Sequence, residues 1–185
     1  IKTIEDFIAA GQKFQEVFPD KYFVNQGPQP IHYMYDGLLS NSEDAYFADA
    51  DGNYQLVDSP YFATLMENLK AINDSGIAYP TDDWSSDWGP GFADDKVASW
   101  TNFQWGLLHL PSRGLPEQQG KWGVAHWPEF SRYGSSGGGS LRVFPVGAEH
   151  TDLALDFTIK MKLDPGFQVF LWERTGRIPN SISAL

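Results

Sequence analysis

Residues 82–105 gather side chains that can recognise a small polar molecule. This stretch holds four of the seven tryptophans, Trp84, Trp88, Trp100 and Trp105, together with several aspartates. An aromatic ring stacks on the apolar C–H face of a sugar, whose hydroxyls need fixed polar partners. Trp84 and Trp88 stand among Ser, Asp, Gly and Pro, a composition typical of loops, so we expect both to face a ligand or lie exposed at its rim. A packed core also collects tryptophans, and that reading stays open for the others.

Polar side chains that could bind the hydroxyls of such a ligand lie close to these tryptophans in the sequence. Asn102 and Trp105 lie three residues apart at the opening of an expected helix, directly after an expected strand. A side-chain amide, a ring and the unbonded N–H groups of a helix start therefore converge there. We expect Asn102 and a nearby acid, Asp83 or Asp87, to fix ligand hydroxyls. A core position for Trp105 is the alternative.

The same residues offer little support for catalysis. A glycosidase needs two carboxylates that face each other across the bond, and acids in loops are usually solvated. The four histidines are isolated, and the sequence has no HExxH, GxSxG, P-loop or GxGxxG motif. We therefore predict no catalytic residue, no metal and no cofactor. The candidate acids are Asp82, Asp83, Asp87, Asp94, Asp95, Glu117 and Glu129.

Composition limits the remaining functions. The 185 residues are 42% hydrophobic, enough for one domain with a core or for two small lobes. Thirteen basic and 24 acidic residues give a net charge of -11, which disfavours nucleic acid and anionic membranes as partners. The absence of cysteine excludes disulfides, thiolate zinc sites and a cysteine nucleophile. No apolar run approaches the roughly 20 residues of a membrane span. Because the chain starts at Ile1 without a signal peptide, we expect a processed or excised piece, with any signal or lipid anchor lost upstream.

Two helices are predicted by their caps and by apolar positions on one face. Thr3 is a good N-cap for a helix that ends at Pro19. Ser59 caps the second helix, with Pro60 at its first position and Gly76 just past its end. Its buried stripe is expected to contain Phe62, Leu65, Leu69 and Ile72.

The other expected elements are short. An Asp-Gly pair at 51–52 between aromatic-rich runs indicates a β-hairpin over 45–57. We prefer it to a calcium loop, because an EF-hand needs a Glu where Asp58 stands. Because helices and short strands alternate, we expect an α/β fold with helices packed on a short mixed sheet. The expected strands are 22–24, 96–100, 122–125 and 141–144, and the further helices are 102–110, 151–161 capped by Thr151, and 165–176.

A series of short motifs resembles the solute-binding proteins of ABC-type sugar importers, the extracytoplasmic family that includes maltose-binding protein. Their order and spacing, rather than any single motif, make the match specific. The motifs are TIEDFIAAG from Thr3, FADADG from Phe47, NDSGIA from Asn73, FADDKVAS from Phe92, GKWGVAHWP from Gly120 and GGS from Gly138.

The resemblance implies two α/β lobes that close on a sugar at a hinge, without catalysis. It places most of the second lobe in residues 1–130, and a crossing back towards an absent first lobe in 131–185. Trp105 matches the family's stacking tryptophan, and the loop that contains Gly138 and Gly139 matches the crossing segment. Trp84 and Trp88 fall where the family varies with its ligand.

We therefore expect a protein that binds a sugar or oligosaccharide outside the cytoplasmic membrane and delivers it to the permease of an ABC importer. It would be periplasmic or a cell-surface lipoprotein, peripheral to the membrane through its anchor. Two alternatives use the same aromatic residues. One is a carbohydrate-active enzyme or its accessory carbohydrate-binding domain, and the other is a structural interaction domain with buried tryptophans.

Overall fold

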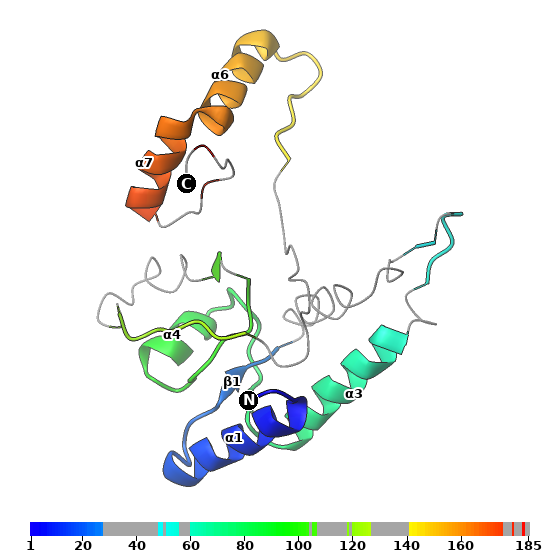
Figure 1. Cartoon of the computed structure of the whole chain (residues 1–185), viewed down its shortest axis with the longest axis vertical. Coiled ribbons are helices and arrows are strands. Elements are labelled where there is room, and N and C mark those ends of the chain that lie inside the picture. Colours follow the sequence, from blue (N-terminus) through cyan, green and yellow to red (C-terminus); the bar gives the residue numbers. More distant parts are fainter. Residues whose placement is uncertain are drawn as a thin grey trace. The chain divides into compact units, whose positions relative to one another are not determined.

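The computed structural model describes residues 1–27, 48–49, 51–55, 60–103, 105–106, 118, 120–126, 141–175, 179 and 183 (Figure 1). The chain divides into two compact units. The first comprises Ile1–Gln104 and Leu110–Gly137, and the second comprises Trp105–His109 and Gly138–Leu185. The assignment of 1–130 and 131–185 to parts of two lobes stays a prediction.

Helix α1, Ile4–Val17, begins at a complete capping box. The Thr3 hydroxyl accepts a hydrogen bond from the Asp6 backbone N–H at 3.1 Å, and the Asp6 carboxylate accepts from the backbone N–H groups of Lys2 and Thr3 at 2.9 and 3.4 Å. These backbone hydrogen bonds lower the pKa of Asp6, with the donor of Lys2 contributing most. The predicted cap at Thr3 and the end of the helix before Pro19 are confirmed.

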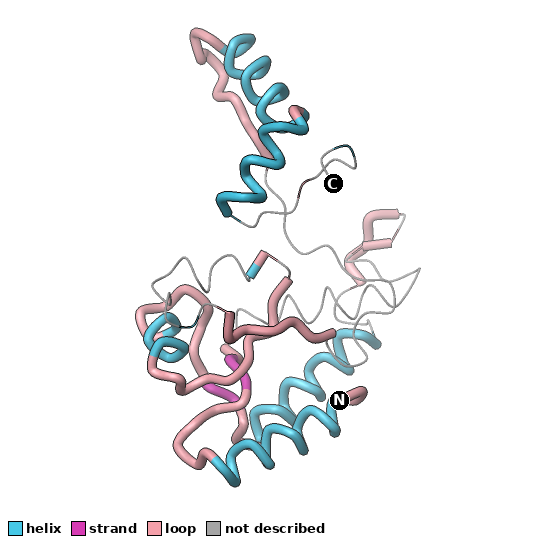
Figure 2. Tube along the Cα trace, turned by 60° about the vertical axis from the view of Figure 1, so that its left-hand side comes forward, coloured by secondary structure: helices cyan, strands magenta, loops and turns pink. Residues whose placement is uncertain are grey.

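Helix α3, Pro60–Asp74, presents its predicted apolar stripe to the interior. Leu65, Leu69 and Ile72 are buried, and Phe62 packs beside them. Figure 2 shows α1 and α3 side by side, and the two helices are in contact. Both helices are therefore held by the same core rather than by their own backbone hydrogen bonds alone.

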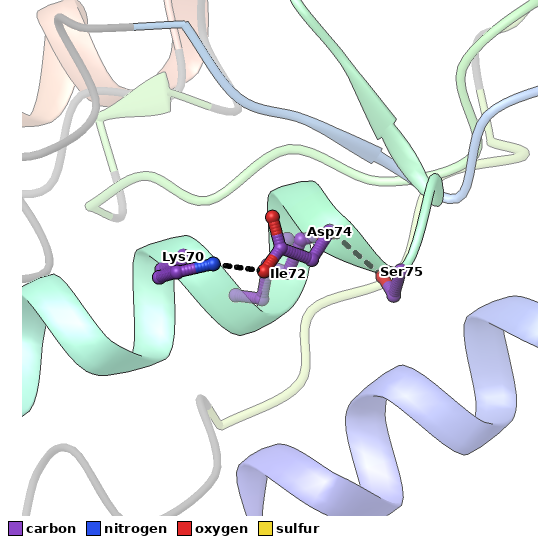
Figure 3. Close-up of polar contacts among 4 residues, drawn as sticks. All are labelled: Lys70, Ile72, Asp74 and Ser75. Carbon is purple, nitrogen blue, oxygen red and sulfur yellow. Dashed lines mark hydrogen bonds and ion pairs between the residues drawn. The ribbon is translucent and has the colours of Figure 1, made fainter.

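The end of α3 is closed by local polar contacts, shown in Figure 3. Lys70 and Asp74 form an ion pair one turn apart. The Ser75 hydroxyl donates to the Ile72 carbonyl at 2.6 Å, which satisfies one of the last carbonyls of the helix. Gly76 follows with a φ of 75°, a left-handed conformation that glycine adopts without strain. The predicted end at Gly76 is thus confirmed.

A small parallel sheet lies at the centre of the first unit. Strand β1, Val24–Asn25, pairs with β2, Ala78–Tyr79, in the register Val24↔Ala78 and Asn25↔Tyr79. A third segment, 97–100, joins the other side of β1 through parallel bridges from Val97 to Tyr22 and from Trp100 to Asn25. In the described part of the chain this sheet is parallel, where the sequence predicted a mixed one. Each connection between neighbouring segments crosses back over the sheet, which sets the strands parallel.

Two predicted strands are wrong. Residues 122–125 and 141–144 have no regular secondary structure, although their composition favours strands. A short apolar run does not by itself supply a neighbouring strand for its backbone hydrogen bonds. The predicted hairpin, in contrast, has its antiparallel bridge between Ala48 and Tyr54.

The hairpin turn is organised by one carboxylate. Asp49 accepts hydrogen bonds from the backbone N–H groups of Asp51 and Asn53 at 3.0 and 2.8 Å. The side-chain amides of Asn53 and Gln55 each donate to its other oxygen at 3.0 Å. These bonds, with the side chain of Asn53 first, lower the pKa of Asp49. The carboxylate that a calcium loop would use is thus already engaged in the turn.

The sheet separates two groups of buried side chains. Neighbouring residues of β2 point to opposite faces, so that Ala78 packs on one group and Tyr79 on the other. The helix-pair cluster lies between α1, α3 and the sheet; its buried members are Ile4, Phe7, Val24, Leu65, Leu69, Ile72 and Ile77. The tryptophan cluster includes helix α4, Trp88–Ala93; it consists of buried Trp88, Phe92 and Val97 with Tyr79, Trp84, Trp100 and Trp122 packed against them.

The described part of the second unit is mainly two consecutive helices, α6 (Thr151–Leu163) and α7 (Pro165–Thr175). Asp164 between them accepts a hydrogen bond from the Phe167 backbone N–H at 2.6 Å and so caps α7. Thr151 is the first residue of α6 and not its cap, because its hydroxyl donates to the Ala148 carbonyl at 3.0 Å. No residue of α6 is buried.

Many apolar side chains of these two helices are exposed, and Phe157 retains 64% of its accessible surface. Others are Leu153, Leu155, Ile159, Leu163, Val169, Phe170 and Trp172. Even so, none of the helices in the described ranges combines the length and apolar character needed to cross a bilayer.

Candidate functional site

The predicted ligand residues of the first unit follow the ends of parallel strands. The chain leaves β1 after Asn25, β2 after Tyr79 and the third segment after Trp100, all at the carboxyl edge of the sheet. Loops at this edge are where open parallel sheets bind ligands. Asp83, Trp84, Asp87 and Trp88 lie on the chain that follows β2, and Asn102 lies just after the third segment. We call this group of loops the carboxyl-edge site.

Asp83 is the centre of a buried hydrogen-bond network in this site. Its side chain is only 4% exposed. One carboxylate oxygen accepts from the Asn25 side-chain amide at 2.9 Å, and the Trp100 indole N–H lies 3.0 and 3.1 Å from the two oxygens. The network joins the ends of all three parallel segments. The sequence predicted that Asp83 or Asp87 fixes ligand hydroxyls, which stays a prediction; the structure shows that Asp83 is buried and positions its neighbours.

Two buried side chains after β1 retain unused hydrogen-bonding atoms. Asn25 is 0% exposed and Gln26 is 5% exposed. The Asn25 Oδ1 acceptor and the Gln26 Nε2 donor have no hydrogen-bond partner within the described structure. Buried polar atoms are nearly always paired, and an unpaired one costs about 1–3 kcal/mol, so a ligand or water is the expected partner. Sequence reasoning missed both residues, although their place between a buried strand and Gly27-Pro28 was a signal.

Trp88 is not at the rim of the site, and that expectation is wrong. It is 2% exposed and begins α4 instead of lying in an open loop. Its ring centroid lies 4.8 Å from that of Trp84 and 4.9 Å from that of Trp100, tilted by 40° and 65°. The six-residue helix turns the chain back onto the sheet and buries the ring, which a composition rich in Gly, Pro and Ser did not reveal.

Trp84 is half-buried, which is compatible with its predicted place facing a ligand. Its φ of 71° is in the left-handed region, where a bulky side chain is strained by about 1–3 kcal/mol. Edge contact with Trp100, at 5.8 Å and 82°, and the contact with Trp88 hold it there. Strain of this kind persists only where surrounding contacts determine the conformation, and it concentrates at ligand sites.

The remaining predicted residues are less closely assembled. Asp87 is exposed and its carboxylate accepts from the Ser86 hydroxyl at 3.2 Å. Asn102 is half-buried; its carbonyl oxygen accepts from the Phe103 backbone N–H at 2.7 Å, and its Nδ2 has no described hydrogen-bond partner. Trp105 is half-buried and is assigned to the second unit, so its place beside Asn102 at a ligand stays a prediction.

Gly138 and Gly139 lie outside the described residues. Of the predicted helix 102–110, residues 102 and 103 are not helical and Gly106 is. Among the side chains that the structure describes, no three His, Cys, Asp or Glu residues are grouped so that they could hold a metal ion.

Comparison with known proteins assigns the chain to a family. The model of the bacterial extracellular solute-binding proteins matches residues 1–185, and the chain therefore belongs to this family. No curated protein matches the sequence. Membership supports solute binding in bacterial transport and a location outside the cytoplasm, with a transporter as partner, and the family is typically non-enzymatic.

Proposed function

We propose that this extracellular solute-binding protein binds a sugar or oligosaccharide and delivers it to the permease of an ABC-type importer. The family supplies solute binding outside the cytoplasm and a role in transport. We infer from the residues and the motif series that the solute is a sugar, that the partner is a permease, and that the protein has two lobes. A lipid anchor upstream of Ile1 would hold the protein at the cell surface or in the periplasm.

The observation that carries the proposal is the buried Asp83 network beside the half-buried ring of Trp84 at the carboxyl edge. A sugar hydroxyl donates one hydrogen bond and accepts two. Asn25 Oδ1 offers an acceptor and Gln26 Nε2 offers a donor, both without a described partner. A hydroxyl-rich ligand satisfies atoms of both kinds, whereas an apolar ligand would leave them unpaired.

The aromatic residues take different parts in this proposal. Trp84 stacks on a sugar ring and contributes on the order of 1 kcal/mol. Trp88 lies behind Trp84 and holds it in place, rather than meeting the ligand itself. Trp105 provides a second platform, by resemblance to the family's stacking tryptophan. Asn102 and Asp87 contact hydroxyls at the edge of the sugar.

The lobe arrangement is part of the same proposal. Residues 1–130 form most of the second lobe, and 131–185 cross back towards a first lobe, with Gly138 and Gly139 in the crossing segment. The exposed apolar side chains of α6 and α7 support this arrangement, because large exposed apolar patches usually mark a surface that another part of a protein covers. A sugar then binds tightly only when both lobes enclose it.

Tryptophan fluorescence titrated with a panel of oligosaccharides tests the proposal. We expect a saturable change, stronger in a longer form that carries the first lobe. Trp84→Ala should weaken binding about fivefold, the equivalent of roughly 1 kcal/mol. Trp172→Ala, a matched change of a half-exposed tryptophan on α7, should leave the affinity unchanged.

Two results would contradict the proposal. If no oligosaccharide changes the fluorescence of the longer form, the solute is of another class. If a glycoside is hydrolysed and replacement of Asp83 or Asp87 abolishes turnover, the alternative reading as a carbohydrate-active enzyme or its accessory domain is correct.

A further inference from the structure

A pocket lies on the first unit, at the opposite edge of the sheet from the carboxyl-edge site. Its volume is about 250 Å³, and it is lined by residues from the end of α1, from the start of the third parallel segment, and by Gln118, Lys121 and Trp122. Val97 lines this pocket and forms a parallel bridge with Tyr22, which lies just before β1 in the chain. The pocket therefore lies at the edge of the sheet where the parallel segments begin, and we call it the amino-edge pocket.

Three aromatic rings form the apolar part of the amino-edge pocket. Phe14 lies on the last turn of α1 and Phe18 directly follows the helix, and their ring centroids are 5.0 Å apart. Trp122 comes from the chain beyond the sheet, and its ring packs 5.6 Å from that of Phe92. A flat apolar group of a ligand can therefore contact aromatic rings that come from two different segments of the chain.

Trp122 is fixed by a buried amide. The Gln118 side-chain carbonyl accepts from the Trp122 indole N–H at 3.0 Å. The Gln118 Nε2 donates to the Phe92 carbonyl at 2.6 Å and to the Asp95 carboxylate at 3.1 Å. Both ends of the amide are thus used to hold the ring. A wall fixed in advance loses little entropy when a ligand binds.

Two ammonium groups line the same pocket. Lys21 Nζ lies 5.5 Å above the centre of the Phe18 ring, and Lys121 comes from beside Trp122. Neither lysine forms an ion pair with another described residue, whereas the nearby Lys96 pairs with Asp94 at 3.3 Å. Asp95, the acid in the lining, accepts from Gln118. The pocket is therefore a locally cationic place on a chain whose net charge is -11.

We propose that the amino-edge pocket binds a small organic anion with one flat apolar ring, such as an aromatic carboxylate. The ring would lie among Phe14, Phe18 and Trp122, and the carboxylate would meet the ammonium groups of Lys21 and Lys121. Single-ring ligands suit a pocket somewhat smaller than the roughly 300–1,000 Å³ that larger ligands occupy. The site is separate from sugar binding and does not depend on it.

The test uses 4-fluorobenzoate as probe and ¹⁹F NMR of the full chain to measure its affinity. We expect saturable binding that weakens with salt, because exposed charges are screened. Lys21→Gln with Lys121→Gln should weaken it about three- to tenfold, the sum of two partly exposed charge contacts. The uncharged 4-fluorobenzamide should bind at least threefold more weakly than the benzoate.

Two variants make the result specific. Lys70→Gln with Lys160→Gln removes the same charge from exposed, ion-paired lysines elsewhere, and should leave the benzoate affinity unchanged. Ala98→Phe places a ring in the exposed lining of the pocket and should abolish binding without loss of any charge. The proposal is overturned if no saturable binding occurs, if the two lysine pairs behave alike, or if benzamide binds as well as benzoate.

Discussion

The two clusters on opposite faces of the sheet are built on different principles. The helix-pair cluster is made of aliphatic and phenyl side chains from α1, α3 and the sheet. The tryptophan cluster surrounds a buried carboxylate, contains the strained Trp84, and leaves the Trp88 indole N–H without a described partner. Hydrocarbon packing stabilises without any need for a ligand, whereas unpaired polar atoms lower stability and suit recognition. We infer that one face maintains the fold and the other binds solute.

The largest effect should come from the helix-pair cluster. Leu65→Ala removes a side chain that is almost fully buried, and we expect a loss of about 2–5 kcal/mol in the free energy of unfolding. Urea denaturation measures it. The adjacent Met66→Ala, at a half-exposed position, should change stability by less than about 0.5 kcal/mol. Similar results for the two would mean that this cluster does not carry the fold.

Asp83→Ala should have the next largest effect, and it should act on both stability and binding. It removes the acceptor of the Asn25 amide and the Trp100 indole, and we expect a loss of about 2 kcal/mol. Sugar affinity should fall as well, because Asn25 is no longer held in place. Asp87→Ala, an exposed acid four residues later, should leave stability unchanged. Denaturation and fluorescence titration of both variants decide whether the network is needed.

Gln26→Met separates stability from recognition most sharply. It removes a buried donor without a described partner, so we expect stability to stay equal or rise by up to about 1 kcal/mol. Sugar affinity should fall about tenfold if Nε2 bonds a hydroxyl.

Gln15→Met is the matched control for that change. The Gln15 amide donates to the carbonyls of Lys21 and Gly76 at 3.2 and 3.0 Å, so its replacement should cost about 1 kcal/mol and leave sugar binding intact. Loss of stability in Gln26→Met would show that its amide serves the fold.

The smallest effect concerns Asp6 in the cap of α1, an exposed residue that belongs to neither cluster. The pKa of Asp6 is below its ordinary value of 3.8 in the folded chain. The unfolded chain therefore binds the proton first, so this contribution is complete above about pH 4 and disappears as pH falls through the folded pKa. Asp6→Asn should flatten the dependence of the melting temperature on pH below about 4. Asp20→Asn makes the same change of net charge outside the cap and is the control for that change.

The sequence predicted the local parts of the fold well. The cap at Thr3, the stripe of α3 and the stop at Gly76 follow from hydrogen bonding and side-chain periodicity within a few residues. The strands at 122–125 and 141–144 failed, because a strand depends on a partner that lies elsewhere in the chain. In the described residues the sheet is parallel, where a mixed one was predicted, for the same reason.

For the site, the sequence indicated the stretch but not the part that each residue takes. Trp84 and Asp83 were identified from their types and spacing. The burial of Trp88 and the network of Asp83 with Asn25 and Trp100 depend on how α4 folds onto the sheet. Asn25 and Gln26 were missed because their one local signal, a place between a short strand and Gly27-Pro28, does not reveal that their side chains are buried.

By itself, the sequence determined the helices at 4–17, 60–74, 151–163 and 165–175, the cap at Thr3 and the hairpin turn, because these depend on neighbouring residues. The motif series further indicated an extracellular solute-binding protein, which the match over residues 1–185 confirms; its sugar specificity stays a prediction. Only the tertiary structure decided which polar atoms are buried without partners, which tryptophans are covered, and where the amino-edge pocket lies. These features arise where residues far apart in the chain come together, as in the hydrogen bond of Asn25 with Asp83, or where Phe14 and Trp122 line one pocket, and no local pattern contains them.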